Sequence, residues 1–307
     1  MATYRPLEGK LAIITGASRG IGEAIAHNLA AKGCNLVLNY TSAGSKSLAD
    51  SLAAELATTH KIRTLAVQAD VAAGGDAPAA AITAATSAAD LVGAARIVAL
   101  ARDHFTTGAE TPFQIDIIIN NAGIAINDRV ENIKYADFTE TYRVNVLGPL
   151  RLIQAAQPYL PPAGARSGRI VNLSSVSSAA GFIGQTVYGG SKAALEAMTR
   201  VWARELAEHA TVNAINPGPV YGPMYSSNTH EFLADIRGWI DRTPLMRPRP
   251  GVDSEEVVAA TRDPMSGGGR PAYPGEIAGI VAMLCLPDSA WCTGQVVSAN
   301  GGMIMQQ

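Results

Sequence analysis

The sequence is poor in cysteine and in charge. Its 307 residues include three cysteines, Cys34, Cys285 and Cys292. This odd number, at spacings that match no zinc-binding pattern, predicts no disulfide framework and no metal site. Only 16% of the residues are charged and the formal net charge is -2, which argues against the basic face that nucleic-acid binding needs. Hydrophobic residues make up 48%, as expected for a globular protein with a sizeable core.

Long apolar runs are also missing. None reaches the ~18 residues of a membrane span, and the N-terminus lacks the basic and apolar regions of a signal peptide. Neither a repeat nor a linker divides the chain. We therefore expect one domain over residues 1–307, located in the cytoplasm, with no membrane and no nucleic-acid partner.

The first pattern that points to a ligand is a strand, a glycine-rich turn and a helix. Residues 11–15 (LAIIT) predict a buried strand, TGASRGIG follows at 15–22, and apolar residues then recur at helical spacing. Glycines in such a turn permit a tight bend, close approach of a diphosphate and packing of the helix on the sheet, while the helix N-terminus faces the anion. The alternative is an ordinary strand–turn–helix corner. The cofactor-binding candidates are Gly16, Ser18, Arg19, Gly20, Ile21 and Gly22.

The second predicted strand, residues 35–39, ends without an acidic residue. NAD-binding folds usually place Asp or Glu there to hold the ribose 2′-hydroxyl. Here Asn39 is followed by Tyr40, Thr41 and Ser42, so no carboxylate would repel a 2′-phosphate, and Arg19 can pair with one. The sequence therefore predicts NADPH/NADP+ as cofactor, unless Arg19 is merely a solvated loop residue.

Two later strand ends add cofactor candidates. Asp70 and Val71 follow the third predicted strand, near the expected adenine, although Asp70 could instead cap a helix. The fourth strand runs into NNAG, where Asn121, Ala122 and Gly123 are small enough for the backbone to lie against a cofactor.

Strand and helix patterns alternate along the chain, which predicts an α/β, doubly wound parallel sheet with helices on both faces. The seven expected strands are residues 11–15, 35–39, 65–70, 115–120, 169–174, 211–215 and 295–298. A helix is expected over residues 138–152, with Asn145 on its exposed side. Residues 72–108 are longer than one crossover helix needs and are interpreted as a surface insertion, with a helix from about 87 to 104.

Residues 222–275 interrupt this alternation. Apolar residues from Phe232 to Ile240 predict an amphipathic helix, Asp253 or Ser254 could cap a second one, and residues 266–275 (SGGGRPAYPG) favour a flexible loop. The segment follows the sixth strand at the edge where ligands bind, so we interpret it as a substrate lid rather than a packing or subunit-contact insertion. The candidates for substrate contact are Phe182, Tyr221, Met224, Tyr225 and Trp239.

A candidate acid/base group lies between these segments. Tyr188 and Lys192 are one helical turn apart, and Ser175 precedes them by thirteen residues. An ammonium near a phenol would lower its pKa from about 10 and make it a better proton donor and acceptor at neutral pH. This spacing alone is also common on solvated helix faces.

Taken together, TGASRGIG, NNAG, Asn145, Ser175, Tyr188-x-x-x-Lys192 and NPG at residues 216–218 occur in the order and at the separations typical of one family. The chain resembles the short-chain dehydrogenases/reductases, in their compact one-domain branch with a Rossmann-type fold. The resemblance covers nearly the whole chain except residues 72–108 and the enlarged lid.

This resemblance implies roles for individual residues. Tyr188 would be the general acid, Lys192 would lower its pKa and hold the nicotinamide ribose, Ser175 would orient the carbonyl, and Asn145 would hold a water of a proton relay. The nicotinamide carboxamide would contact Pro217, Gly218 and Val220. Family members often carry Thr where this chain has Gly222, and they tend to form homodimers or homotetramers.

The expected function is therefore NADPH-dependent reduction of a ketone or aldehyde to an alcohol. The aromatic and sulfur-containing residues of the lid indicate a bulky, mainly apolar substrate, such as a secondary-metabolite ketone, with a 3-oxoacyl thioester as the competitor. The alternatives are an NADP-binding regulator or scaffold, and an isomerase-type acid/base catalyst on the same fold.

Overall fold

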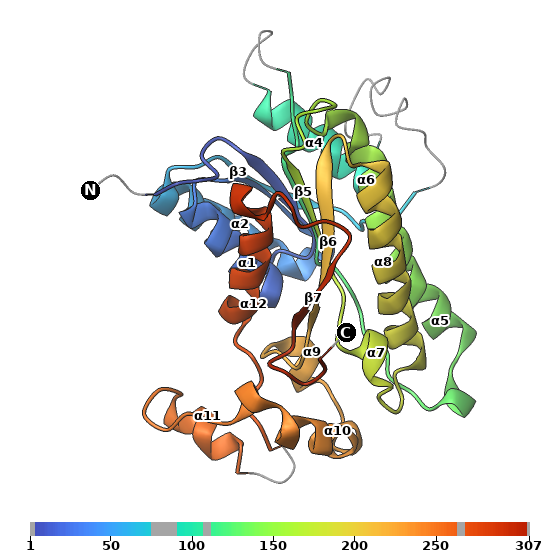
Figure 1. The fold of residues 1–307 in the computed structure, drawn as a ribbon. Helices are drawn as coiled ribbons and strands as arrows, with labels where there is room; N and C mark the ends of the chain where they lie inside the picture. Colours follow the sequence, from blue (N-terminus) through green and yellow to red (C-terminus); the bar gives the residue numbers. More distant parts are fainter. Residues whose placement is uncertain (1–3, 75–90, 107–111, 263–267, 306–307) are drawn as a thin grey trace.

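A computed structural model of the protein describes residues 4–74, 91–106, 112–262 and 268–305. Its core is a parallel sheet of seven strands in the order β3-β2-β1-β4-β5-β6-β7 (Figure 1). The strands are β1 Leu11–Ile14, β2 Asn35–Tyr40, β3 Thr64–Gln68, β4 Ile117–Asn120, β5 Gly168–Leu173, β6 Ala210–Pro217 and β7 Val296–Ala299. The predicted doubly wound α/β sheet is confirmed.

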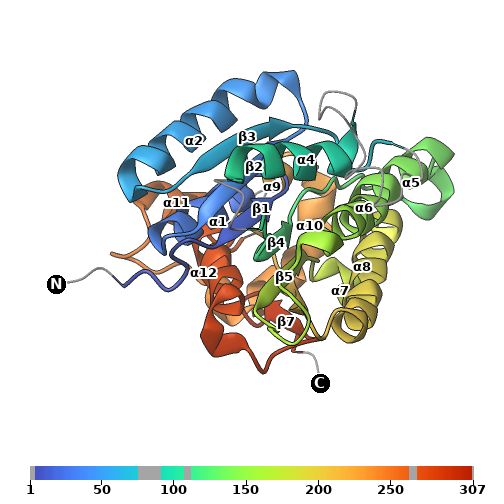
Figure 2. The ribbon, with the colours of Figure 1, turned by 90° about the horizontal axis from the view of Figure 1, so that it is seen from above.

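The strands are apolar because both faces of the sheet are covered. In β1, Ala12 and Ile14 pack into one core cluster while Leu11 and Ile13 pack into the other, as the two-residue period of a strand requires. Helices α1 Gly20–Ala31, α2 Lys46–His60 and α12 Pro274–Cys285 cover the first face, and α4 Gly93–Phe105, α6 Gly148–Ala156 and α8 Thr186–Glu205 cover the second (Figure 2).

The remaining described helices lie outside these two layers. They are α5 Tyr135–Tyr142, α7 Ser177–Ala180, α9 Pro223–Ser226, α10 His230–Arg242 and α11 Glu255–Ala260, with one-turn 3-10 helices at Ala43–Ser45, Val130–Asn132, Gln157–Tyr159, Pro244–Met246 and Pro287–Ser289. No helix among the described residues is both long and apolar enough to cross a membrane.

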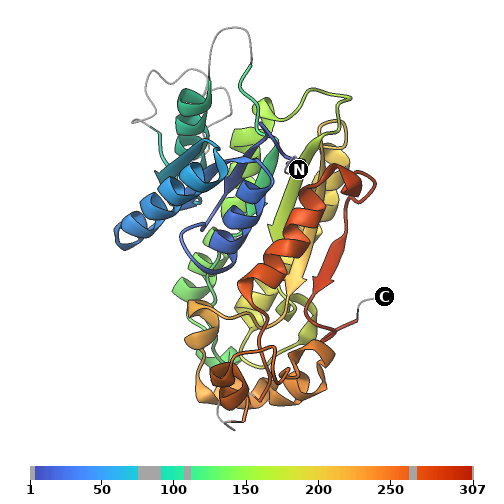
Figure 3. The same cartoon turned by 90° about the vertical axis from the view of Figure 1, so that its left-hand side faces the viewer.

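The strand order reverses between β1 and β4, and the carboxyl ends of these neighbouring strands open the crevice where ligands bind in such sheets. Helices α9, α10 and α11 lie beyond this edge of the sheet (Figure 3). The fold therefore brings the glycine turn, NNAG, Ser175 and the segment expected to be a lid to the same side of the molecule.

The structure corrects part of the expected surface insertion at residues 72–108. Helix α4 begins at Gly93 rather than near residue 87, and it buries Ile97, Val98 and Ala101 against the sheet. It is the crossover helix between β3 and β4, so this part belongs to the core. Residues 75–90 and 107–111 lie outside the described residues.

The helix expected over residues 138–152 is also different. Helix α5 ends at Tyr142, the chain then forms one turn of π-helix at Arg143–Leu147, and α6 follows from Gly148. Such π-turns are rare and occur frequently at functional sites.

Residues 268–275, expected to be flexible, are tied down in the structure. The buried Arg270 donates from Nη1 to Glu276 Oε2 at 2.8 Å, its Nε lies 3.7 Å from Asp253 Oδ1, and its backbone N–H donates to the carbonyl of Met246. Ser254 caps α11, while Asp253 pairs with Arg249 instead. Of the two residues that could cap this helix, Ser254 is therefore the cap.

Candidate active site

The glycine turn has the conformation that its glycines predict. Gly16 and Gly20 both have a φ of +62°, a left-handed conformation that favours glycine. A Cβ on Gly22 would lie 2.3 Å from the carbonyl oxygen of Gly16, so only glycine fits there. Asn121 fixes the turn from the neighbouring strand, donating from Nδ2 to the carbonyls of Thr15 at 2.9 Å and Gly16 at 3.0 Å.

The turn can receive an anion. The side chain of Arg19, at the N-cap of α1, does not cap the helix, and a Cβ on Gly20 would meet open space. The first backbone N–H groups of a twelve-residue helix are thus available beside the cavity, which is the arrangement that binds diphosphates.

Asn39 is not a cavity residue, contrary to expectation. Its side chain is buried and donates from Nδ2 to the carbonyls of Ala69 at 2.9 Å and Val67 at 3.3 Å, where it joins β2 to β3. The cavity edge is formed by Tyr40 and by the exposed Thr41 and Ser42.

Asp70 reaches the cavity but is already paired. Its carboxylate lies 2.8 Å from Arg143 Nη1 and accepts a hydrogen bond from the backbone of Ala72 at 3.1 Å. Arg143 also pairs with Glu140 at 2.7 Å, and these hydrogen bonds raise the pKa of its guanidinium. The alternative that Asp70 caps a helix does not hold, because a turn follows it at residues 71–72. The sequence pattern contained no signal for Arg143.

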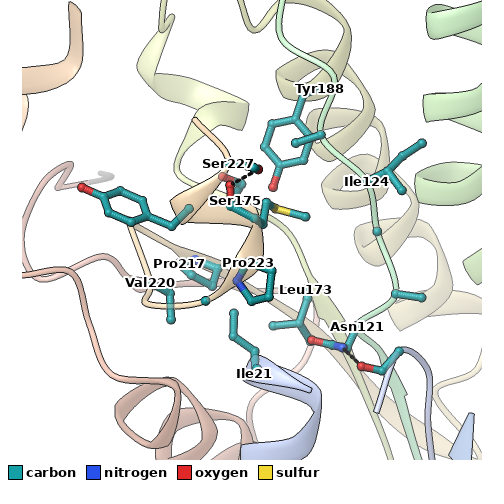
Figure 4. A pocket seen from close by; sticks show the side chains of 18 of the residues that line it. Ile21, Asn121, Ile124, Leu173, Ser175, Tyr188, Pro217, Val220, Pro223 and Ser227 are labelled. Atoms are coloured by element: carbon teal, nitrogen blue, oxygen red, sulfur yellow. Dashed lines mark hydrogen bonds between the residues drawn. The ribbon is translucent and has the colours of Figure 1, made fainter. Parts of the chain in front are cut away.

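Ser175, Tyr188 and Lys192 converge at the end of β5. Figure 4 shows the hydroxyl of Tyr188 directed toward Ser175. Ser175 donates to the hydroxyl of Ser177 at 3.0 Å, and Lys192 donates from Nζ to the carbonyl of Leu173 at 2.7 Å. The Lys192 ammonium lies 5.8 Å from the centre of the Tyr188 ring. All three candidates line one cavity.

Burial is the main cause of the pKa shifts of Tyr188 and Lys192. It raises the pKa of Tyr188, and a hydrogen bond with Ser175 partly offsets this effect. It lowers the pKa of Lys192 to about 8, against the opposing charge of Glu196. The expected lowering of the Tyr188 pKa by Lys192 is not seen in the protein alone, where burial sets the direction and only the hydrogen bond with Ser175 opposes it. The phenol is protonated at neutral pH, the form that donates a proton.

A buried carboxylate supports this group from one turn further along α8. Glu196 accepts hydrogen bonds from Ser174 Oγ at 2.6 Å and Ser178 Oγ at 2.7 Å. Glu196 thereby fixes Ser174, which precedes Ser175, and Ser178, which follows Ser177. Sequence reasoning missed Glu196, although its position four residues after Lys192 puts both on one helix face.

Asn145 is fully buried, so the expected exposed position is wrong. Its side chain accepts from the backbone N–H of Ile124 and donates to the carbonyl of Ile124, both at 2.9 Å, and also donates to Ser191 Oγ at 3.0 Å. A Cβ on Gly123 would lie 3.2 Å from Asn145 Oδ1 and 3.3 Å from Lys192 Nζ. The π-turn that carries Asn145 thus aims it at the narrow gap beside Lys192.

The cavity has a volume of about 800 Å³. Most sequence candidates line it: Gly16, Ser18, Arg19, Gly20, Ile21, Tyr40, Thr41, Ser42, Asp70, Val71, Asn121, Ala122, Gly123, Ser175, Tyr188, Lys192, Pro217, Gly218, Val220, Phe182, Tyr221, Met224 and Tyr225. Gly22, Asn39, Asn145 and Trp239 are not among the lining residues. Trp239 instead packs edge-on against Phe182, with ring centres 5.7 Å apart.

Polar residues that the sequence pattern did not single out also line the cavity, including Asn127, Gln185 and Asn228. No cluster of metal-ligating side chains occurs within the ranges that the structure describes.

Gly222 has a physical reason to differ from the usual threonine. Its φ is +151°, a conformation that strains any residue with a Cβ, although a Cβ there would meet no neighbour. Backbone conformation, rather than lack of space, favours glycine at this position.

Comparison with known proteins agrees with this geometry. Residues 10–93 match the family described as short chain dehydrogenase, and residues 101–262 match the one described as Enoyl-(Acyl carrier protein) reductase. An L-xylulose reductase of Aspergillus niger is 52% identical over 97% of this chain and 98% of its own, and an L-xylo-3-hexulose reductase of Hypocrea jecorina is 46% identical over 98% of both. The crystal structure of a blue fluorescent protein from a metagenomic library in complex with NADPH is 32% identical, with a TM-score of 0.69 over 98% of this chain and 100% of the other. The chain belongs, as its motifs predicted, to the short-chain dehydrogenase/reductase family of oxidoreductases.

Proposed function

We propose that this protein is an NADPH-dependent reductase that converts the carbonyl group of a small molecule to an alcohol, reversibly. The observation that carries the proposal is the convergence of Ser175, Tyr188 and Lys192 in the cavity that also contains the glycine turn. Two close relatives are reductases by name, and both names specify keto sugars.

The residues present fit NADPH. The uncapped start of α1 and the turn from Gly16 to Ile21 would hold the diphosphate. Arg19, Thr41 and Ser42 are exposed at the cavity edge and would hold the 2′-phosphate. Asn39 stands where NAD-binding folds usually have the acidic partner of the ribose 2′-hydroxyl, and its side chain bonds β3 instead of facing the cavity. NADPH, when bound, supplies the hydride.

The protein's own part is proton transfer and orientation. The hydroxyls of Ser175 and Tyr188 would both bond the carbonyl oxygen, which polarises the carbonyl and places its oxygen beside a proton donor. Tyr188 would give its Oη proton to that oxygen. The nearby Lys192 ammonium would stabilise the resulting phenolate, and Asn145 would hold the water through which Lys192 is reprotonated.

Residues 222–275 would form the substrate lid of this reductase. Tyr221, Met224, Tyr225 and Phe232 line the cavity and favour a bulky apolar ketone or a 3-oxoacyl thioester. The amides of the same cavity and the names of the two relatives favour a keto sugar instead. The exposed Tyr135 and Phe138 on α5 are compatible with a homo-oligomer.

The test is Tyr188→Phe, which removes the proton donor and keeps the ring. We expect NADPH to bind with unchanged affinity while kcat falls by about 10²–10⁴-fold, the usual contribution of a general acid. Tyr135→Phe, on the exposed side of α5, is the control and should be silent.

Binding titrations and NADPH absorbance give both readouts. Full activity of Tyr188→Phe would contradict the role of Tyr188 as the general acid. If the wild-type protein bound NADPH but consumed none with keto sugars, apolar ketones or 3-oxoacyl thioesters, the reductase proposal would be contradicted and a cofactor-binding regulator or an isomerase-type catalyst would remain. The same titrations compare NADPH with NADH, and equal affinities would contradict the NADP preference.

A further inference from the structure

Three side-chain amides form a directional chain along the cavity wall. Gln185 Nε2 donates to Asn127 Oδ1 at 3.3 Å, and Asn127 Nδ2 donates to Asn228 Oδ1 at 3.2 Å. Asn228 Nδ2 in turn donates to the carbonyl of Tyr225 at 3.0 Å. The chain joins the start of α8, the loop after β4 and the segment between α9 and α10, and all three amides line the cavity.

The direction of these hydrogen bonds leaves one amide oxygen, Gln185 Oε1, without a donor. Each amide in the chain donates its N–H to the next acceptor, and no amide of the chain precedes Gln185 to donate to its oxygen. This oxygen is buried and has no hydrogen-bond partner within the described part of the chain, on a side chain that is only 9% exposed. A buried polar atom without a partner costs about 1–3 kcal/mol, so native proteins rarely keep one without a reason.

The position of Gln185 connects this acceptor with the chemistry. Gln185 precedes Tyr188 by three residues at the N-terminus of α8, which sets both side chains on one side of the helix. Both residues line the same cavity, so a substrate whose carbonyl meets Tyr188 would lie beside Gln185. A substrate hydroxyl near that carbonyl would be the donor that the buried Oε1 lacks.

We infer that Gln185 Oε1 accepts a hydrogen bond from a substrate hydroxyl, and that the substrate is an open-chain polyhydroxylated ketone of the keto-sugar class. This inference rests on the proposed reductase function and specifies its substrate. A bulky apolar ketone would cover Gln185 Oε1 without giving it a donor. Sites built to bind a hydroxyl discriminate strongly against analogues that lack it, because their own polar groups are then left unpaired.

The amide chain also links this contact to the lid. Asn228 lies just before α10, and on the same side Arg129 Nη2 pairs with Glu231 of α10 at 2.9 Å. A substrate hydroxyl on Gln185 would complete a hydrogen-bonded series from α8 to the lid, and such a series holds its members in place. Breaking the chain at Asn228 should weaken recognition of the same hydroxyl less than removing the acceptor does.

The experiment compares L-xylulose with 2-pentanone, a ketone of equal length without hydroxyls, and with 2-tetralone, a bulky apolar one. We expect wild-type kcat/KM with NADPH to be at least about 100-fold higher for L-xylulose than for 2-pentanone. Gln185→Met keeps the length of the side chain and removes the acceptor. It should lower kcat/KM for L-xylulose by about 10- to 100-fold, as expected for one lost hydrogen bond, and change 2-pentanone less than about threefold.

Two controls accompany this variant. Gln154→Met makes the same replacement on the exposed side of α6 and should leave all three substrates unchanged. Asn228→Ala tests the chain independently, even if Gln185→Met does not fold, and should lower kcat/KM for L-xylulose alone by about three- to tenfold. NADPH affinity reports that each variant is folded.

The outcomes separate the two proposals. A wild-type preference for 2-tetralone, or equal losses on L-xylulose and 2-pentanone in Gln185→Met, would overturn the keto-sugar inference while NADPH-dependent turnover still supports a reductase. A protein that binds NADPH and reduces neither these three ketones nor a 3-oxoacyl thioester would overturn the reductase proposal itself.

Discussion

The carboxyl edge of the sheet and the proposed lid, residues 222–275, both contribute residues to the same cavity, but they are held in different ways. At the sheet edge, Asn121 and Asn145 bond the backbone of neighbouring segments, and the strands beneath belong to two large apolar clusters. The lid rests on a small cluster that includes Ile236, Ile240 and Met246. The reacting groups are therefore held by the main core, while the residues of the proposed lid that face the cavity are held by a much smaller one.

Ion pairs add to the contacts of the small apolar cluster that supports the lid. The pair between Arg129 and Glu231 is solvent-exposed, and exposed pairs contribute little to stability. Arg270 is different because its side chain is buried within the proposed lid and contacts both Glu276 and Asp253. Arg270 is therefore the contact that we expect to hold this segment in place.

The largest effect is expected at the sheet edge, from Gly22→Ala. The new Cβ would lie 2.3 Å from the Gly16 carbonyl oxygen and 2.7 Å from Asn121 Nδ2, so the turn must shift. Overpacking of this kind costs about 1–3 kcal/mol, and we expect NADPH affinity to fall by up to about 100-fold. Isothermal titration with NADPH and thermal unfolding measure both effects.

Gly279→Ala is the matched control for this prediction. Gly279 is an exposed residue inside α12 whose Cβ would meet no neighbour. The change should stabilise the protein by about 0.5–1 kcal/mol and leave NADPH affinity unaltered. If Gly22→Ala bound NADPH as tightly as Gly279→Ala, the close packing at the turn would not matter for the cofactor.

A smaller effect, confined to the lid, is expected from Arg270→Met. The variant removes the ion-pair partner of Glu276, which keeps the hydrogen bond from the backbone N–H of Tyr273, and should loosen the segment before α12. We expect KM for the carbonyl substrate to rise on the order of tenfold, with NADPH affinity unchanged, because lid variants act on substrate capture. Steady-state kinetics and NADPH titration provide the measurement.

Arg237→Met tests the same replacement on α10, where the partly exposed Arg237 side chain lies 3.6 Å from Asp241. It should change KM by less than about twofold. An equal rise in KM in both variants would show that burial of Arg270 is not what anchors the lid.

The smallest effect concerns pH and the carboxylate behind the catalytic lysine. Lys192 has a pKa of about 8, and the charge of Glu196 raises it. The ammonium is therefore present below pH 8 and is lost as the pH rises, so kcat/KM should fall on the alkaline side. Glu196→Gln keeps an acceptor for Ser174 and removes the charge. It should move this fall to lower pH by less than about one unit.

The pH profile of kcat/KM with saturating NADPH measures this shift. Glu205→Gln, at the exposed end of α8, removes a like charge and should leave the profile unchanged. Burial raises the pKa of Tyr188, so its phenol stays protonated over this range and does not obscure the titration of Lys192. A profile that is identical in wild type and Glu196→Gln would contradict the electrostatic role of Glu196.

Much of the sheet and of the site at its carboxyl edge was predictable, because the sequence patterns that indicate them are local. Strand periodicity located all seven strands to within a few residues, and the glycine turn and the spacing of Tyr188 and Lys192 are short-range patterns. The predictions that were wrong depended on distant partners. The amide of Asn39 is used by β3, and Arg270 is buried by contacts with Asp253 and Glu276. Asp70 lines the cavity as predicted, but no local pattern indicated its pairing with Arg143 seventy-three residues later.

The sequence by itself determined the order of strands and helices, the glycine turn and the presence of a tyrosine–lysine pair on one helix. These features depend on periodicity and spacing, which neighbouring residues carry. Only the tertiary structure decided that Asn145 is buried in a π-turn beside Lys192 and that desolvation raises the pKa of Tyr188. It alone placed Asn127, Gln185 and Asn228 in one hydrogen-bonded chain. Burial and side-chain pairing between segments about 40 to 100 residues apart depend on how the chain folds back on itself, and no local pattern encodes them.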